Sequence, residues 1–256
     1  MSEKEKKDSR RTFLKAAGAF GAGSIIATLA PFVNASGKSS FKKSPPMTVP
    51  TRPFGKTGVN VSILSLGGVL GMSDLLIFRQ AMKMGVTYWD TADSYGGGKN
   101  EKAIGKYFAK FPNDRKKVFL VTKARSSDPK KLTEKLNTSL QRMNTSYIDM
   151  YFIHYLKDVK DELTTEVEAW AEKAKADGKI RFFGFSAHKN MENSMLAAAK
   201  LGWIDGIMVS YNYRLMIKDE MKRAVDACIK AGIGLTAMKT QAAFSAHFYS
   251  SIGFET

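Results

Sequence analysis

The sequence predicts a parallel α/β fold, built either as a (β/α) barrel or as an open doubly wound sheet. Short apolar runs recur along the chain, and each ends at a glycine or a polar residue, as buried parallel strands do. Stretches with helical periodicity separate most of these runs at a spacing of roughly 25 to 35 residues, which makes consecutive strands parallel. No GxGxxG motif follows an early strand, and this disfavours the doubly wound alternative.

The expected elements follow one another in a regular order. Gly55 and Gly58 lie between extended-looking residues in 52–61, which predicts a small hairpin placed to plug the amino-terminal end of a barrel. The strands are expected at residues 63–67, 86–90, 118–123, 150–154, 182–186, 207–212 and 234–239, and the clearest helices at 74–84, 101–111, 130–143 and 218–231.

Polar side chains that could take part in a reaction lie where the predicted strands end. Residues 85–98 read GVTYWDTADSYGGG, so an apolar run stops at Asp90 and a turn-rich segment then carries Tyr95. Lys123, His154 and Ser186 close the next three strands. The carboxyl ends of barrel strands share one face, so these side chains are expected at one mouth.

The composition favours a packed domain without a metal centre. Hydrophobic residues make up 44% and charged residues 25%, which argues against disorder for most of the chain. The net charge is +16, but half of this excess lies in residues 1–60, and no basic stripe with interleaved aromatic residues follows, so we expect no nucleic-acid binding. The single cysteine, Cys228, can form neither an intramolecular disulfide nor a metal cluster.

The first 35 residues look like a targeting segment. A charged start leads to SRRTFLK at 9–15, and an uncharged Ala- and Gly-rich run then ends at Ala35, a plausible cleavage site. This pattern is typical of twin-arginine export signals, and a membrane anchor is the alternative. We therefore expect a partner in the twin-arginine export machinery and a periplasmic or otherwise exported location, tethered to the membrane if the signal is not cleaved. Residues 36–50 are expected to be a linker, and 51–256 the barrel.

Seven segments together resemble the aldo-keto reductase family in order, spacing and residue choice. They read RPFGKTGVNVSILSLGG, GVTYWDTADSYGGGKNEKAIGKYF, VFLVTKAR, SLQRMNTSYIDMYFIHY, GKIRFFGFSAH, GIMVSYN and GIGLTAMK. The resemblance implies a (β/α)8 TIM barrel and NAD(P)H-dependent reduction of a small carbonyl compound. It also implies four catalytic positions, matched here by Asp90, Tyr95, Lys123 and His154.

The four residue types suit carbonyl reduction. A free tyrosine has a pKa of about 10, so Tyr95 needs the cation of Lys123 nearby to favour the phenolate and release its proton. Asp90 would keep the desolvated Lys123 charged, and His154 could donate to the carbonyl oxygen. Taken singly, the Asp90 and Lys123 side chains also fit a structural ion pair, and His154 a satisfied core histidine. The family order of all four favours function.

For the cofactor, the resemblance points to Ser186 and Asn212 as partners of the nicotinamide amide. Ala187 replaces the usual second residue of the Ser-Asn pair. Met238 stands where many relatives carry an aromatic residue against the nicotinamide ring, and Lys239 is a candidate for the pyrophosphate. NADP(H) is expected in preference to NAD(H), although the tail lacks the basic, glycine-bearing segment with which the family holds the adenosine phosphate.

The expected eighth strand and its helix have no counterpart in residues 241–256, whose His247 and Phe248 are expected to be apolar filler. Without them, the first and seventh strands would be unpaired edges, at a cost of about 7 to 15 kcal/mol if about five core side chains lose burial. We therefore expect a barrel that lacks its carboxyl-terminal strand and helix. This shortfall motivates an alternative function: a nucleotide-binding, catalytically weak barrel that senses redox state or serves as a structural subunit.

Overall fold

The structure is a computed structural model that describes residues 48–68 and 74–240. All of them belong to the second of the two units into which the chain divides, Ser44–Thr256. The expected targeting segment at 1–35, most of the linker at 36–50 and the tail with His247 and Phe248 lie outside the described residues. In the part of the chain that is described, no helix has both the length and the apolar character needed to cross a membrane.

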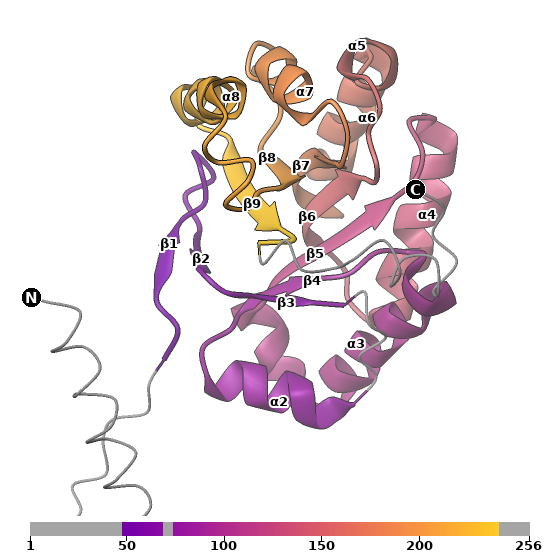
Figure 1. The fold of residues 1–256 in the computed structure, drawn as a ribbon. Coiled ribbons are helices and arrows are strands. Elements are labelled where there is room, and N and C mark those ends of the chain that lie inside the picture. The colour runs from indigo at the N-terminus through magenta and orange to yellow at the C-terminus, as the bar shows by residue number, and fades with distance from the viewer. Residues whose placement is uncertain (1–47, 69–73, 241–256) are drawn as a thin grey trace, which may run out of the picture. The chain divides into compact units, whose positions relative to one another are not determined.

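Seven parallel strands form one sheet, in the same order as in the sequence (Figure 1). The runs predicted as strands are all present, with ends shifted by one or two residues in most of them. The strands are β3 (Ser65–Gly67), β4 (Tyr88–Asp90), β5 (Phe119–Ala124), β6 (Ile148–Ile153), β7 (Ile180–Ala187), β8 (Gly206–Ser210) and β9 (Gly234–Met238).

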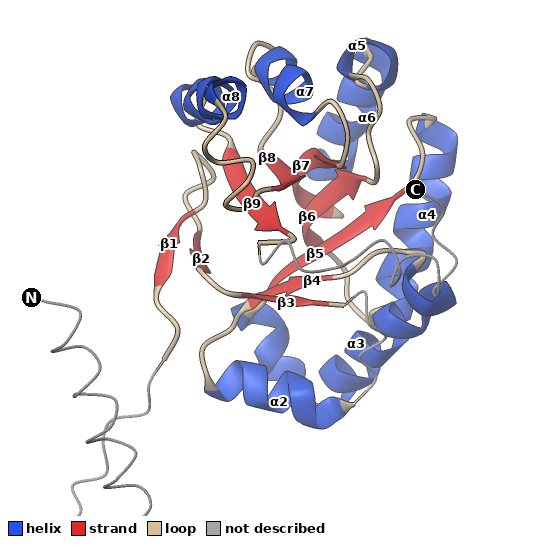
Figure 2. Cartoon of the chain, viewed as in Figure 1, coloured by secondary structure: helices blue, strands red, loops and turns tan. Residues whose placement is uncertain are grey.

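The helices connect consecutive strands and lie on the outer side of the sheet (Figure 2). Local sequence signals set several of their starts; in α4, for example, the Asp128 carboxylate accepts from the backbone N–H groups of Lys130 and Lys131, and Pro129 opens the first turn. The helices are α2 (Leu75–Lys83), α3 (Lys99–Lys110), α4 (Pro129–Arg142), α5 (Val159–Glu162), α6 (Thr165–Ala176), α7 (Met191–Ala198) and α8 (Asp219–Lys230), with 3-10 turns η1 (Tyr95–Gly98) and η2 (Pro112–Lys117).

The sheet curls into a barrel and is not an open doubly wound sheet. A doubly wound sheet reverses its strand order at a switch point, whereas here each strand pairs with the preceding one throughout. The curl brings distant strands together, since the hydroxyl groups of Tyr88 on β4 and Thr236 on β9 lie 2.8 Å apart. Inward side chains such as Phe152 pack with Tyr88 in an interior cluster.

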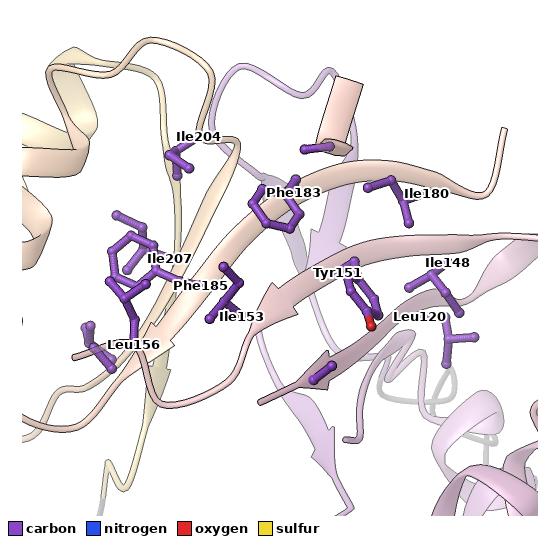
Figure 3. Close-up of a cluster of buried hydrophobic side chains, with 14 of the residues drawn as sticks. Leu120, Ile148, Tyr151, Ile153, Leu156, Ile180, Phe183, Phe185, Ile204 and Ile207 are labelled. Carbon is purple, nitrogen blue, oxygen red and sulfur yellow. The ribbon is translucent and has the colours of Figure 1, made fainter. Parts of the chain in front are cut away.

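The second, larger core lies between the strands and the surrounding helices (Figure 3). Tyr151 and Ile153 of β6 belong to it, while Phe152 between them points into the barrel, as the two-residue period of a strand requires. Cys228 on α8 is buried in this layer as well, and burial raises the pKa of its thiol to about 11. Cys228 is thus a packed helix residue and not an ionised nucleophile.

The antiparallel hairpin of β1 (Thr51–Pro53) and β2 (Asn60–Ser62) packs its turn into the amino-terminal end of the barrel. Phe54 is 3% exposed and lies 5.4 Å from the ring of Phe119 between centroids. The backbone N–H of Lys56 donates to the carbonyl of Gly232 at 2.7 Å. Gly55 has a φ of 54°, and a Cβ there would lie 2.3 Å from the same carbonyl oxygen, so only glycine fits. The predicted plug is thus present.

The described strands leave two edges, β3 and β9, that pair on one side only. Both contain exposed residues, whereas every residue of β5, β6 and β8 is buried. The expected unpaired edges at the first and seventh strands are therefore present among the described residues.

Candidate active site

The carboxyl ends of β4, β5 and β6 bring together the four residues expected to perform chemistry. Asp90 is the last residue of β4, and Lys123 is the next to last of β5. Tyr95 opens η1, and His154 directly follows β6. The strand predicted over 150–154 ends one residue too late, because Tyr155 takes a positive φ of 61° and turns the chain out of the sheet. Neighbouring parallel strands place these ends at one mouth.

Lys123 is the centre of this group. It is 1% exposed, and its Nζ donates to Asp90 Oδ1 at 2.6 Å and to the Thr91 carbonyl at 2.8 Å. The same nitrogen lies 5.0 Å from the centre of the Tyr95 ring. Burial raises the pKa of the Asp90 carboxyl, and the ammonium of Lys123 opposes this rise. Two charges taken out of water each cost several kcal/mol unless they are paired, so each of these two residues holds the other charged.

His154 faces Tyr95 as a neutral imidazole. The two rings meet edge to face, with 5.8 Å between their centroids and an angle of 77°. Burial lowers the pKa of His154 from 6.5 to about 2, and the cations of Lys123 and Arg125 add to this effect. A neutral imidazole keeps one N–H donor, which suits a hydrogen bond to a carbonyl oxygen.

The segment that carries Tyr95 extends the hydrogen bonding of the sheet beyond β4. The N–H of Thr91 donates to Val121 O at 2.9 Å, and the N–H of Asp93 donates to Lys123 O at 3.0 Å. The glycines at 96–98 then take φ values of 58°, 64° and 85°, which other residues rarely adopt. The chain can therefore turn sharply after Tyr95 and begin α3.

A polar cluster outside the barrel holds the same segment from behind. Lys135 Nζ lies 2.6 Å from Asp93 Oδ2, and Arg142 Nη1 donates to the Asp93 carbonyl at 3.0 Å. Glu101, whose side chain is fully buried, accepts from Arg142 at 3.1 Å and from Thr122 Oγ1 at 2.7 Å. Both oxygens of Glu101 thus have partners on β5 and α4, whereas Asp93 is bonded through Oδ2 and its buried Oδ1 has no hydrogen-bond partner among the described residues. The cluster fixes the backbone that presents Tyr95.

The four residues expected to hold a cofactor lie at the carboxyl ends of β7, β8 and β9: Ser186 and Met238 within β7 and β9, and Asn212 and Lys239 just beyond β8 and β9. Asn212 Nδ2 lies 3.4 Å from the carbonyl of Lys239, whose φ is 55°, and Met238 packs against the interior cluster. The strand predicted over 207–212 ends two residues too late, since β8 ends at Ser210 and Asn212 begins a turn. Ser186 is 1% exposed.

The polar groups of this second set fit a carboxamide. The Ser186 hydroxyl accepts from the Tyr155 N–H at 3.3 Å, and among the described residues it donates to no acceptor. Its proton is therefore available to a ligand. Ala187 is fully buried and supplies no polar side chain, while the adjacent His188 has a buried Nδ1 with no hydrogen-bond partner in the described part of the chain. Ala187 therefore cannot supply the second side-chain contact that the resemblance implies for the carboxamide. The unpaired Nδ1 of His188 belongs to the next residue in the sequence.

The family model described as the aldo/keto reductase family matches residues 73–245, which is more than half of the chain. The chain belongs to this family. The fold agrees with this assignment. The described residues form seven parallel strands with helices on their outer side, as in a (β/α)8 barrel whose eighth strand is not among them.

Curated relatives of this aldo/keto reductase family member are similar over part of their length. It is 27% identical to the aldo-keto reductase yakc of Schizosaccharomyces pombe over 65% of this chain and 53% of that protein. It is 29% identical to the oxidoreductase YrpG of Bacillus subtilis over 72% of this chain and 64% of that protein. The chain thus spans between half and two thirds of the length of these two relatives.

The barrel also resembles solved structures of the family. The holo form of the aldo-keto reductase AKR11C1 from Bacillus halodurans superposes with a TM-score of 0.63, at 24% identity over 75% of this chain and 66% of that one. At this identity the likeness supports the fold alone.

His154 and His188 make the stability of this family member dependent on pH. Burial and cationic neighbours lower the pKa of His154 from 6.5 to about 2 and that of His188 from 6.5 to about 4. The unfolded chain binds protons at both residues near pH 6.5 while the folded chain does not. Stability is therefore complete above pH 6.5 and is lost as the pH falls, by about 2 kcal/mol for each histidine at pH 5.

We expect the melting temperature to fall between pH 7.5 and pH 5, and the fall to be smaller in His188→Gln. Thermal melts across this range measure both slopes. A wild-type melting temperature that does not change with pH, or an identical slope in the variant, would contradict the assignment of buried neutral histidines.

Several residues that shape the site escaped the sequence prediction. Glu101 falls on the apolar face of α3, in register with the buried Ile104 and Phe108, and a carboxylate in such a row signals a buried cationic partner. Arg125 directly follows β5 and Tyr155 is the second residue beyond β6, but nothing in the sequence indicates that they contact each other. In residues 48–68 and 74–240, no three metal-ligating side chains gather into a cluster.

Proposed function

We propose that the protein is an NAD(P)H-dependent oxidoreductase that reduces the carbonyl group of a small aldehyde or ketone to an alcohol. One observation carries the proposal: a buried lysine is paired with a carboxylate and lies 5.0 Å from a tyrosine ring that a neutral histidine meets edge-on. The reaction needs a proton donor beside a group that stabilises negative charge on oxygen. Tyr95 and His154 supply these two functions.

Tyr95 is the proton donor in this proposal. The Lys123 ammonium beside its ring stabilises the phenolate that remains after the proton leaves. Asp90, at 2.6 Å, keeps that ammonium charged although it is buried. The proton moves from the tyrosine oxygen to the carbonyl oxygen of the substrate, which becomes the alcohol.

His154 orients the carbonyl and supports the developing charge on its oxygen. Its low pKa keeps the ring neutral in the physiological range, so it acts as a hydrogen-bond donor and not as a competing acid.

Ser186 and Asn212 would hold the nicotinamide carboxamide, Met238 would pack on the ring, and Lys239 would meet the pyrophosphate. When bound, the reduced nicotinamide supplies the hydride. We expect NADP(H) in preference to NAD(H), and the name of the yeast relative, which specifies NADP(+), supports this choice.

A second candidate is a barrel that binds the nucleotide but turns over little, as a redox sensor or a structural subunit. The two strand edges that pair on one side only favour it.

The test is a fluorescence titration of the purified protein with NADPH and NADH, followed by turnover of a panel of aldehydes and ketones. Nucleotide binding with reduction of at least one carbonyl compound is expected. Binding without turnover would favour the second candidate, and no binding would overturn both.

Export by the twin-arginine route is a separate proposal, supported by the SRRTFLK segment at 9–15. It predicts that the protein fractionates with the periplasm, or with the membrane if the signal is retained. Accumulation in the cytoplasm of a cell with an intact twin-arginine pathway would contradict it.

A further inference from the structure

Arg125 is a cation at the mouth with no acidic partner among the described residues. It follows Lys123 by two positions, at the carboxyl end of β5, and is exposed. Lys123 is already paired with Asp90, but no carboxylate in the described part of the chain lies within ion-pair distance of Arg125. Within residues 48–68 and 74–240, the mouth therefore holds a positive charge without an acidic partner beside the candidate active site.

The side chain of Arg125 is held in place. Its Cζ lies 4.7 Å above the ring of Tyr155, and that ring lies 4.2 Å from the ring of His154 between centroids. Tyr155 also contacts the ring of His188 at 4.5 Å, so the aromatic support is packed on a second side. A guanidinium stacked on an aromatic face keeps its N–H edge available for a carboxylate, which it can bind through two parallel hydrogen bonds.

The arrangement places an anion-binding group close to the carbonyl-binding group. His154 and Arg125 are separated by no more than the sum of the two distances through Tyr155, 4.2 and 4.7 Å. The positive charge is also felt at His154, since Arg125 is one of the causes of its lowered pKa. Arg125 follows β5, whereas the candidate cofactor residues lie at the carboxyl ends of β7, β8 and β9, so the anion it meets is not expected to be the cofactor pyrophosphate.

We propose that Arg125 binds a carboxylate of the substrate, so that the preferred substrates are short oxo acids. The inference rests on the proposed function, because it assumes that His154 marks the position of the carbonyl oxygen. With C–C bonds of about 1.5 Å, the space between the two groups suits a carbonyl and a carboxylate separated by about two to four carbon atoms. Tyr155 is the positioning residue for the guanidinium.

The first test compares kcat/KM for 4-oxobutanoate with that for its uncharged methyl ester at saturating NADPH. The wild type is expected to prefer the acid by at least about tenfold, as for one charge-assisted hydrogen-bonded pair. Arg125→Gln is expected to lose that preference, mainly through KM, and Arg125→Lys to keep part of it because the charge remains. Equal use of acid and ester by the wild type, or an unchanged ratio in Arg125→Gln, would overturn the proposal.

The matched control is Arg79→Gln. Arg79 is also exposed and also stacked on an aromatic ring, with its Cζ 4.6 Å from the Phe111 centroid, but it lies on α2. This substitution is expected to leave the ratio of acid to ester unchanged. A similar loss in Arg79→Gln would mean that the effect comes from net charge and not from Arg125.

A binding measurement separates failure of this inference from failure of the proposed function. Succinate has the same four-carbon skeleton as 4-oxobutanoate but no aldehyde group, so it cannot be reduced at this site. Calorimetry can measure its Kd with the wild type and with Arg125→Gln. At least about tenfold weaker binding to the variant is expected. If no carbonyl compound is reduced but succinate binding depends on Arg125, the reductase proposal is wrong and the anion site stands. Equal binding to both proteins, or none to either, overturns the anion site.

Discussion

Replacing Tyr95 with phenylalanine is expected to lower kcat for carbonyl reduction by about 10²- to 10⁴-fold, the usual contribution of a positioned general acid. The phenyl ring can keep the edge-to-face contact with His154 and its position 5.0 Å from Lys123 Nζ, because only the hydroxyl is removed. The measurement is steady-state reduction of the best aldehyde of the panel, together with a nucleotide titration. Nucleotide affinity is expected to stay close to that of the wild type, since the candidate cofactor residues lie at the ends of other strands.

Tyr147→Phe is the matched control for this experiment. Tyr147 precedes β6, at the amino end of the barrel, and its ring stacks under Arg115 at 3.9 Å, a contact that phenylalanine can preserve. Its kcat is expected to match the wild type. If Tyr95→Phe keeps more than about a tenth of the wild-type kcat, the proton comes from another group, and the assignment of Tyr95 as the acid is wrong.

The sequence predicts the barrel because its signals are local. Apolar runs of strand length, helix caps such as Asp128 and the glycines after Tyr95 each depend on a few neighbouring residues. Parallel strands in sequential order then bring their carboxyl ends to one face, so Asp90, Lys123 and His154 could be expected to meet without any knowledge of distances. Strand ends were less predictable, because they depend on backbone turns such as that at Tyr155.

The contacts that refine the site could not be predicted in the same way. The bonds from Lys135 and Arg142 to Asp93 join residues 42 and 49 positions apart, and no periodicity connects them. The stack of Arg125 on Tyr155 depends on how two loops meet after β5 and β6. The lowered pKa of His154 depends on burial and on cations that only the folded chain brings near. The residue types in the sequence indicated which reaction to expect. The charges and pKa values of the site depend on tertiary packing, which the sequence pattern does not show.

Replacing Lys123 with methionine is expected to damage both stability and catalysis. The substitution leaves the Asp90 carboxyl, 13% exposed, without its cation, and breaking a buried pair in this way costs about 3 to 5 kcal/mol. For a domain of this size, that corresponds to a fall in melting temperature of about 6 to 20 °C. Without the ammonium, the pKa of Asp90 should rise further above that of the unfolded chain. The loss of stability should therefore be small near pH 4 and should grow as the pH rises towards 8.

The double variant Asp90→Asn with Lys123→Met separates the two effects. It removes both charges at once, so most of the stability lost in Lys123→Met is expected to return, while kcat stays at least about 10²-fold below the wild type because nothing stabilises the Tyr95 phenolate. Thermal melts and aldehyde kinetics on the wild type, both single variants and the double variant complete the cycle. A double variant that regains activity together with stability would mean that the ion pair serves only to hold the strands together. A double variant that is stable and inactive would mean that the buried charges are kept for the chemistry at Tyr95 and that the fold does not depend on them.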